Sequence, residues 1–307
     1  EMRSSYDNFA AATGGAESRA MGLTPDPTAG FTVPESWNDR VIVAAKAYGG
    51  IMSISNVMRT SSGEPINFVQ RNSTARVGRI IAEHGATTPV DVPFTNTTIG
   101  SFMYTADHTL ISLQLLQDNI YNVDQHIIDD QAEGLGRIMA QHLATGVGGG
   151  TEPEGVVTAA TSGAISIAVN GLSMLDFFNL KHSVDPAYRA MGARFVFNDN
   201  TLLGAKSLLD GTGVPIWNPN LSGAEASTID GSPYTIDQAM PNVATGEFPI
   251  LYGDFSKYRI RQVGGITLFR FAELFMRNHQ IAFQTFGRFD AKYVDAQGGA
   301  IKKLTVA

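Results

Sequence analysis

Two hydrophobic periodicities follow one another along the chain. In PINFVQR (65–71) apolar and polar residues alternate, and RVGRIIAEHG (76–85) and VDVPFTNTTIGSFMYTADH (90–108) continue as predicted strands rich in β-branched and aromatic residues. Polar residues 83–88 lie between them, which predicts the tip of a long hairpin. Few of its positions are apolar on both faces, so we expect this hairpin either to extend into solvent or to lie against a neighbouring subunit.

The period then changes from two to the three-and-four spacing of a helix. From Ser112 onward the apolar positions are Leu116, Ile120, Val123, Ile127, Leu135, Ile138, Met139 and Leu143. The spacing predicts one helix of roughly 30 residues, about 45 Å long. Gly146 supplies its C-terminal stop. A helix of this length suits a rigid spine.

The rest of the chain predicts an extended arm at one end and an α/β region at the other. Pro25, Pro27 and Pro34 favour extended backbone within residues 1–40, and residues 39–48 are compatible with a short helix. Beyond the spine, Ser173 and Asp176 form the start of a capping box. The further predicted elements are a helix ending before Asp185-Pro186, a strand in 193–198, a helix in 199–210, a turn at Asp230-Gly231, and strands in 248–255, 266–271, 279–289 and 300–306.

Composition removes several classes of protein. The 307 residues include no cysteine, which excludes disulfide scaffolds, thiolate metal sites and cysteine nucleophiles. No apolar run approaches the roughly 18 to 20 residues that a membrane span needs. The formal net charge of −7 argues against tight nucleic-acid binding through a general positive field.

Candidate chemistry is sparse. The glycine stretch Gly146, Gly148–Gly150 follows a helix C-terminus and is succeeded by Thr-Glu-Pro-Glu, whereas a phosphate loop precedes a helix and carries Lys-Ser/Thr. We therefore interpret it as a flexible connection. His126 with Asp129 and Asp130 is the nearest approach to a metal cluster, and a solvated helix face explains it. We likewise interpret five carboxylates as ordinary surface residues: Asp118, Asp124, Glu133, Glu152 and Glu154. We expect the three arginines of the hairpin to form ion pairs with a neighbouring subunit: Arg71, Arg76 and Arg79. We expect no catalytic, cofactor-binding or metal-binding residues.

Several segments, in order, resemble the major capsid protein of tailed double-stranded DNA bacteriophages, the Hong Kong 97-type coat fold. AGFTVPESWNDRVI resembles the Val-Pro segment of the family's N-terminal arm. GRIIAEHGATTPVDVPFTNTTIGSFMYTADHTLISLQLLQDN resembles its hairpin tip, return strand and helix start. GVGGGTEPEGVV, ARFVFNDNTLLGAKSLLDGTGVPIW and FPILYGDFSKYRI resemble its glycine loop, central strand and helix, and Gly-Asp-Phe turn. The resemblance covers roughly residues 20–307.

The resemblance implies an α+β fold of four parts. Residues 1–40 would be the N-terminal arm, and 64–100 the extended hairpin called the E-loop. The peripheral domain, with the spine helix, would take 41–63, 101–150 and 258–290. The axial α/β domain would take 151–257 and 291–307.

The implied function is a non-enzymatic shell protein that assembles in the host cytoplasm into hexamers and pentamers of an icosahedral phage head. The implied partners are other copies of the chain, a portal protein at one vertex, a cement or decoration protein, and double-stranded DNA contacted weakly and non-specifically. An encapsulin, a cellular compartment of the same fold, is the alternative. The start at Glu1 favours the phage protein, because such coat proteins often lose an N-terminal scaffolding segment. A hydrolase with an unrecognised site is a third, different class.

The resemblance also raises the question of the self-catalysed cross-link of the family's namesake, in which a hairpin lysine attacks an asparagine with help from a glutamate. Asn278 matches the acceptor. Thr285 stands where the glutamate would be, and a slip of one residue gives Gln284 or Phe286, so no base is present. His84 lies near the lysine position, and no lysine occurs between Lys46 and Lys181. We expect a shell held by non-covalent contacts.

Overall fold

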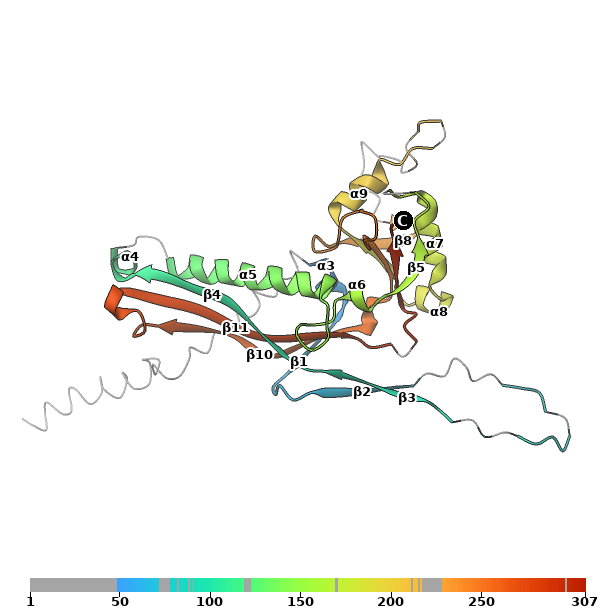
Figure 1. The fold of residues 1–307 in the computed structure, drawn as a ribbon, viewed down its shortest axis with the longest axis horizontal. Coiled ribbons are helices and arrows are strands. Elements are labelled where there is room, and N and C mark those ends of the chain that lie inside the picture. The colour runs from blue at the N-terminus through green and yellow to red at the C-terminus, as the bar shows by residue number, and fades with distance from the viewer. Residues whose placement is uncertain are drawn as a thin grey trace, which may run out of the picture.

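The computed structural model describes residues 49–71, 78–81, 83–87, 89, 91–118, 123–168, 171–210, 212–214, 216, 228–295 and 297–307. The predicted arm over residues 1–40 and the predicted helix over 39–48 lie outside the described residues. Three sheets organise what is described: one of four strands, one of six, and a two-stranded hairpin that projects from between them (Figure 1).

The four-stranded sheet, here called the peripheral sheet, has the order β1-β10-β11-β4. Its strands are β1 (Asn56–Thr60), β10 (Tyr258–Phe271), β11 (Gln280–Tyr293) and β4 (Phe102–Ser112). Strand β1 is parallel to β10, and the other pairs are antiparallel. A 3-10 turn, η2 (Met276–Asn278), lies between β10 and β11. The sequence predicted parts of β10 and β11, and both extend to 14 residues.

Helix α5 (Val123–Thr145) lies along one face of the peripheral sheet (Figure 1). Its stripe of buried residues includes Leu135, Met139 and Leu143, as the three-and-four spacing predicts. The helix start expected at Ser112 is confirmed, because Ser112 is the last residue of β4 and α4 (Leu113–Asp118) begins directly after it. The Ser112 hydroxyl accepts a hydrogen bond from the Leu115 N–H at 3.3 Å, so this serine caps the helix.

The hairpin is formed by β2 (Ile66–Arg71) and β3 (Phe94–Ile99), paired from Ile66–Ile99 to Arg71–Phe94. Its predicted tip is confirmed by a turn at residues 83–84. The predicted strand over 76–85 is wrong for residues 78–81, which form no strand. The predicted strand over 90–108 is likewise wrong for residues 91–93. The described ladder has ended before these residues, and an unpaired segment cannot satisfy strand hydrogen bonds.

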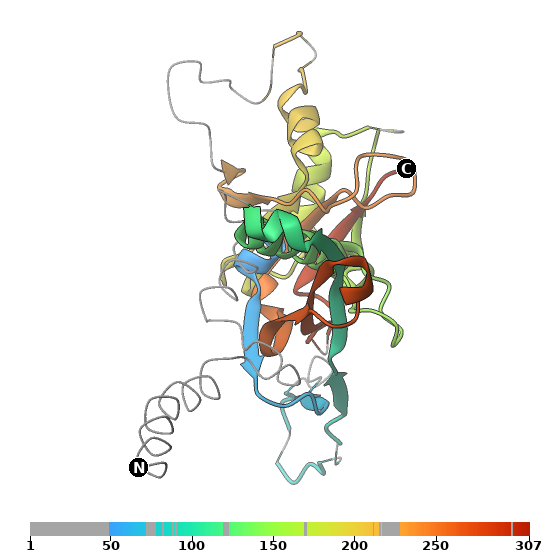
Figure 2. The same cartoon turned by 90° about the vertical axis from the view of Figure 1, so that its left-hand side faces the viewer.

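The six-stranded sheet, here called the axial sheet, has the order β5-β12-β9-β6-β8-β7. Its strands are β5 (Thr161–Ile165), β12 (Ile301–Thr305), β9 (Ile250–Gly253), β6 (Arg194–Phe197), β8 (Ser232–Ile236) and β7 (Thr228–Ile229). The helices of this region are α6 (Val156–Ala159), α7 (Met174–Ser183), α8 (Pro186–Arg189), α9 (Asp199–Lys206) and the 3-10 turn η1 (Phe255–Lys257). Figure 2 shows α9 (yellow) and the hairpin at opposite ends of the molecule.

Local signals set the helix starts of the axial region. Asp176 accepts a hydrogen bond from the Ser173 N–H at 2.7 Å, which confirms the predicted capping box. The Asn198 side chain accepts from the Thr201 N–H at 3.0 Å and caps α9. Helix α9 ends at Lys206, earlier than expected, and the Asp210 carboxylate instead accepts from the N–H groups of residues 212 and 214. An aspartate that bonds to its own following backbone favours a turn.

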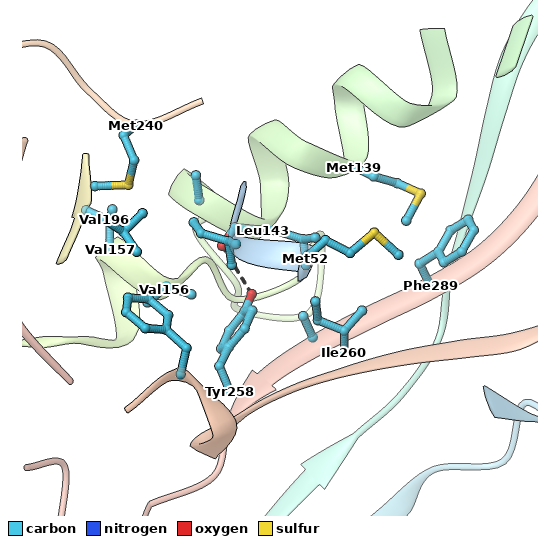
Figure 3. Close-up of a cluster of buried hydrophobic side chains, with 14 of the residues drawn as sticks. Met52, Met139, Leu143, Val156, Val157, Val196, Met240, Tyr258, Ile260 and Phe289 are labelled. Carbon is cyan, nitrogen blue, oxygen red and sulfur yellow. Dashed lines mark hydrogen bonds between the residues drawn. The ribbon is translucent and has the colours of Figure 1, made fainter. Parts of the chain in front are cut away.

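The two sheets share a core at their junction. Buried side chains of the axial sheet, such as Val196 and Leu251, belong to the same cluster as Leu143 and Ile260 of the peripheral region. Tyr258, fully buried, points toward the C-terminal end of α5 (Figure 3). Its hydroxyl donates to the carbonyls of Glu154 at 2.7 Å and Leu143 at 3.2 Å. This tyrosine therefore joins β10 to both ends of the glycine loop.

A short helix, α3 (Gly50–Ile54), connects the first described residues to this junction. The Ile51 N–H donates to Asp237 at 2.8 Å, and the Ala239 N–H donates to the other carboxylate oxygen at 2.9 Å. Asp237 is 1% exposed, and burial raises its pKa to about 6 against the lowering effect of these two hydrogen bonds. One carboxylate thus ties α3 to the end of β8 in the axial sheet.

Candidate subunit-contact surfaces

The two faces of the hairpin differ in exposure. Directly opposite residues share a face, so one face carries Asn67, Val69, Arg71, Phe94, Asn96 and Thr98, here called the hairpin outer face. All of the β2 members and Phe94 are exposed, with Val69 at 70% and Phe94 at 67%. On the other face, Ile66, Phe68 and Gln70 are half-buried, as the alternation predicted. A hairpin with two large apolar side chains in solvent indicates a contact surface.

A second apolar surface lies on the peripheral sheet. Phe283, Thr285 and Phe289 are buried on the face that carries α5, so the alternating residues between them point the other way. On that opposite face the rings of Phe269 and Phe286 meet edge to face, with centroids 5.4 Å apart. An open groove of about 580 Å³ runs beside them. It is lined by Met103, Val263, Gly264, Gly265, Thr267, Phe269, Phe286, Gly287 and Arg288, here called the aromatic groove.

An irregularity in the ladder shapes this groove. The β10–β11 register shifts between Val263 and Thr267, and Gly264 adopts a φ of 64° there. Glycine tolerates that backbone conformation, whereas a side chain would be strained. The bulge and the two exposed glycines leave the floor of the groove without side chains to fill it. Met103, 68% exposed, stands at its rim.

The three residues matched to the cross-link lie in three different places. Asn278 is exposed in the η2 turn between β10 and β11. His84 is exposed in the turn of the hairpin tip with a φ of 64°. Thr285 is fully buried, and its hydroxyl donates to Gln131 of α5 at 2.6 Å. Gln131 in turn donates to the Phe283 carbonyl at 2.8 Å, so Thr285 belongs to a structural network that ties α5 to β11.

The glycine stretch is a hydrogen-bonded excursion between α5 and α6. Isolated bridges join Val147 to Glu154 and Gly149 to Glu152, and Gly148–Gly150 have φ values of 75°, 73° and 93°. Glu152 accepts from the Val147 N–H at 2.6 Å and lies 3.5 Å from His142, whose Nδ1 is 2.7 Å from the Tyr104 hydroxyl. The loop follows the C-terminus of α5, as predicted, and Glu154 pairs with Lys292 at 3.1 Å.

The remaining candidates are surface features. His126, Asp129 and Asp130 are exposed on α5, and no group of three potential metal ligands occurs among the described residues. None of the described helices combines the length and the apolar character that crossing a membrane requires. Sequence reasoning missed two buried charged residues, Arg261 and Asp290, at the base of the hairpin. The alternation Tyr-Arg-Ile-Arg at 258–261 signalled that two arginines share one face of a strand.

Comparison with known proteins assigns the fold. The model of the phage capsid family matches residues 29–306. The capsid of a native GTA particle, computed with C5 symmetry, has a TM-score of 0.75 and 21% identity, covering 86% of this chain and 90% of that chain. Two other solved structures share the fold. Microbacterium phage Oxtober96 has a TM-score of 0.66 at 11% identity (84% and 91% covered), and Gordonia phage Cozz has 0.62 at 13% (84% and 86% covered).

A search of curated protein sequences gives no match. The family model spans most of the chain, and the arrangement of sheets, spine helix and hairpin is the one that the resemblance implied. The chain therefore belongs to the phage capsid family, with the α+β Hong Kong 97-type fold, and is a non-enzymatic major capsid protein of the virion.

Proposed function

We propose that this capsid protein forms the hexamers and pentamers of an icosahedral head around double-stranded DNA, held together without a lysine–asparagine cross-link. The observation that carries the proposal is the exposure of Val69 and Phe94 on the hairpin outer face, together with the open aromatic groove; the described residues of the chain cover neither. The alternative of an encapsulin shell has less support, because the matching family model is that of phage capsids.

The hairpin of one copy is proposed to lie over the aromatic groove of the next. A hairpin cannot cover its own groove, because it projects away from the peripheral sheet (Figure 1). The contact is therefore heterologous, and repeated around an axis it closes into a ring. Burying apolar area stabilises such a contact by about 25 cal/mol per Å². Exposed Val69 and Phe94 on the hairpin and Phe269 and Phe286 in the groove supply that area.

The four-part division is proposed with the boundaries that the resemblance implied: arm 1–40, hairpin 64–100, peripheral domain 41–63, 101–150 and 258–290, and axial domain 151–257 and 291–307. The strand order supports the division in outline, because β1, β4, β10 and β11 make up the peripheral sheet and the C-terminal β12 lies inside the axial sheet. Strand β11 continues to Tyr293, three residues beyond the proposed boundary at 290.

Further partners belong to the same proposal. A shell without covalent links needs other reinforcement, so we include a cement or decoration protein, with a portal protein at one vertex. The net charge of −7 supports weak and salt-sensitive contact with the packaged DNA. Assembly is proposed to take place in the host cytoplasm.

The test is assembly of the purified protein, followed by sedimentation and electron microscopy. We expect closed shells with six-fold and five-fold capsomers. A monomer that stays stable under every assembly condition would contradict the proposal. Duplex binding by unassembled subunits provides a second check, since tight, sequence-selective binding is incompatible with a passive container.

A further inference from the structure

The direction of the hairpin depends on contacts at its root, here defined as residues 60–63 and 99–101. Strands β2 and β3 pair only with each other in the described residues, so no ladder joins the hairpin to the larger sheets. The outgoing chain leaves the end of β1, and the returning chain enters β4 directly after Gly100 and Ser101. Whatever sets the hairpin direction must therefore act on these two short segments.

One buried side chain contacts both segments. Arg261, in the middle of β10, is 1% exposed. On the outgoing segment its guanidinium donates to the Thr60 hydroxyl at 3.1 Å and the Ser62 carbonyl at 2.8 Å. On the returning segment it donates to the carbonyls of Ile99 at 3.2 Å and Gly100 at 2.9 Å. The planar guanidinium directs its donors in fixed directions, so these four acceptors define one geometry.

An acidic residue completes the arrangement. Asp290 lies directly opposite Arg261 in the β10–β11 register, on the same face of the sheet. One of its oxygens accepts from the Gly100 N–H at 2.6 Å, and the other from the Ala291 N–H at 2.7 Å. Gly100 is therefore bound through its carbonyl by Arg261 and through its N–H by Asp290. Burying a polar or charged side chain is costly unless it is hydrogen-bonded, and both of these side chains are hydrogen-bonded.

Two neighbouring arginines of the same sheet face limit the hairpin further. The Arg259 guanidinium lies 4.6 Å from the ring centre of Phe68 in β2. A Cβ atom on Gly63 would lie 2.6 Å from an Arg288 nitrogen, so the outgoing chain passes against that side chain. Arg288 therefore lies against the root, and Arg259 contacts the hairpin just beyond it.

We propose that Arg261 and Asp290 form a positioning clamp that sets the direction of the hairpin before a second subunit binds. The role of this clamp in assembly rests on the proposed function, in which the hairpin must reach the aromatic groove of the next copy. A residue that only filled the core would contact its own sheet, whereas three acceptors of Arg261 lie outside the peripheral sheet. These are the carbonyls of Ser62, Ile99 and Gly100, and the fourth acceptor is the Thr60 hydroxyl at the very end of β1. Rotation of the hairpin would break bonds on both segments at once.

The clamp is tested in the unassembled subunit by a distance measurement. The chain lacks cysteine, so Thr87→Cys near the hairpin tip and Gln141→Cys on α5 can carry a pair of spin labels without background. Arg261→Lys keeps the charge and loses the planar donors, and Asp290→Asn keeps the shape and loses the charge. Arg270→Lys, exposed on the same strand, is the matched control. Urea unfolding of each variant reports whether the fold is retained.

We expect a narrow distance distribution in the parent and control, and a broadened or shifted one in Arg261→Lys and Asp290→Asn. Folded clamp variants with the parental distribution would overturn the proposal. If both unfold, Thr60→Val removes one side-chain acceptor and leaves the carbonyls in place. Broadening in that variant supports the clamp, and an unchanged distribution counts against it.

Assembly separates this inference from the proposed function. Failure of the parent protein to form shells refutes the function and leaves the distance result standing. A parent that assembles, with clamp variants that keep the parental distances, refutes the clamp alone. Folded variants with a broadened distribution should lose closed shells in favour of irregular aggregates or free subunits.

Discussion

The hairpin and the axial sheet are both built from short strands, but they bury very different amounts of surface. In the axial sheet, Phe195, Phe197, Ile250 and Leu251 are fully buried between the helices and the junction core. In the hairpin, one face is exposed along its length, and Phe94 is 67% exposed. The axial sheet is therefore stabilised within one chain, whereas the hairpin is proposed to gain its apolar contacts from another copy. Folding and assembly should respond to mutations in different places.

The largest expected effect on folding is in the axial sheet. Phe195 is fully buried, with ring centroids 4.4 Å from Tyr252 and 5.8 Å from Phe177. Phe195→Ala should lower the free energy of unfolding by about 3–5 kcal/mol, because it leaves a cavity in a packed core. Urea unfolding of the unassembled subunit measures it. The control Leu175→Ala, at a 55% exposed position, should change stability by less than about 0.5 kcal/mol.

The next effect depends on pH and involves the attachment of α3 to the axial sheet. Burial raises the pKa of Asp237 to about 6 from an ordinary value of 3.8, so the folded protein binds this proton more tightly than the unfolded chain. The protonated Asp237 carboxyl therefore contributes about 3 kcal/mol to the free energy of unfolding. This contribution is fully present below about pH 4 and is lost as the pH rises through 6.

Asp237→Asn removes that titration. The difference in unfolding free energy between parent and variant should therefore change across pH 4 to 7. Urea midpoints at several pH values measure the difference. Parallel curves for the two proteins would show that the carboxyl titrates alike in the folded and unfolded states.

A smaller loss of stability is expected where α5 meets the peripheral sheet. Thr285→Val removes the hydroxyl that donates to buried Gln131 and should cost about 1–3 kcal/mol, because the amide oxygen loses its partner. A double variant with Gln131→Leu should recover part of that loss, and thermal unfolding of the set measures the coupling. Additive losses would show that the two side chains act independently.

The hairpin should show the opposite behaviour: little effect on folding and a large effect on assembly. Val69→Asp with Phe94→Asp changes two exposed positions, so unfolding free energy should shift by less than about 0.5 kcal/mol. Closed shells should be lost, since charges would be buried against an apolar groove. Asn96→Asp, on the same face, adds a charge without removing an apolar contact and should be milder. Normal shells from the double variant would argue against the proposed contact.

The last prediction is that assembly leaves the covalent mass of the subunit unchanged. Denaturing electrophoresis of assembled particles should give a single band near the subunit mass of 32.9 kDa, because no lysine–asparagine link is proposed. A ladder of covalent oligomers would contradict this prediction. The buried position of Thr285 indicates that replacing it with glutamate would destabilise the fold rather than supply a base.

Sequence periodicity predicted the elements whose signals are local. The alternation in 65–71 gave β2, the apolar stripe of α5 gave the spine, and Ser173 with Asp176 gave the start of α7. The helix start predicted at Ser112 is local too, since the Ser112 hydroxyl accepts from the Leu115 N–H at the start of α4. The strand predicted over 76–85 had suitable residues but, at 78–81, no ladder partner.

The hairpin clamp could not be predicted in this way. Arg261 is separated from Thr60 by 201 positions and from Ile99 by 162. Three of its four acceptors are the carbonyls of Ser62, Ile99 and Gly100, and every residue type has a carbonyl. The aromatic groove was missed for a similar reason, because alternation alone does not show which face of β10 the spine helix covers.

The order of strands has a consequence for synthesis of the protein. Strands β10 and β11 separate β1 from β4, and β12 separates β5 from β9, although these inserted strands follow their neighbours β1, β4, β5 and β9 in sequence. A nascent chain therefore carries unpaired strand edges until its last segments emerge, which lengthens its exposure to misfolding. The same strand order also protects growing shells from unfinished chains. The hairpin is made early but the groove that would receive it is made late, so an unfinished chain offers growing shells no site to extend them.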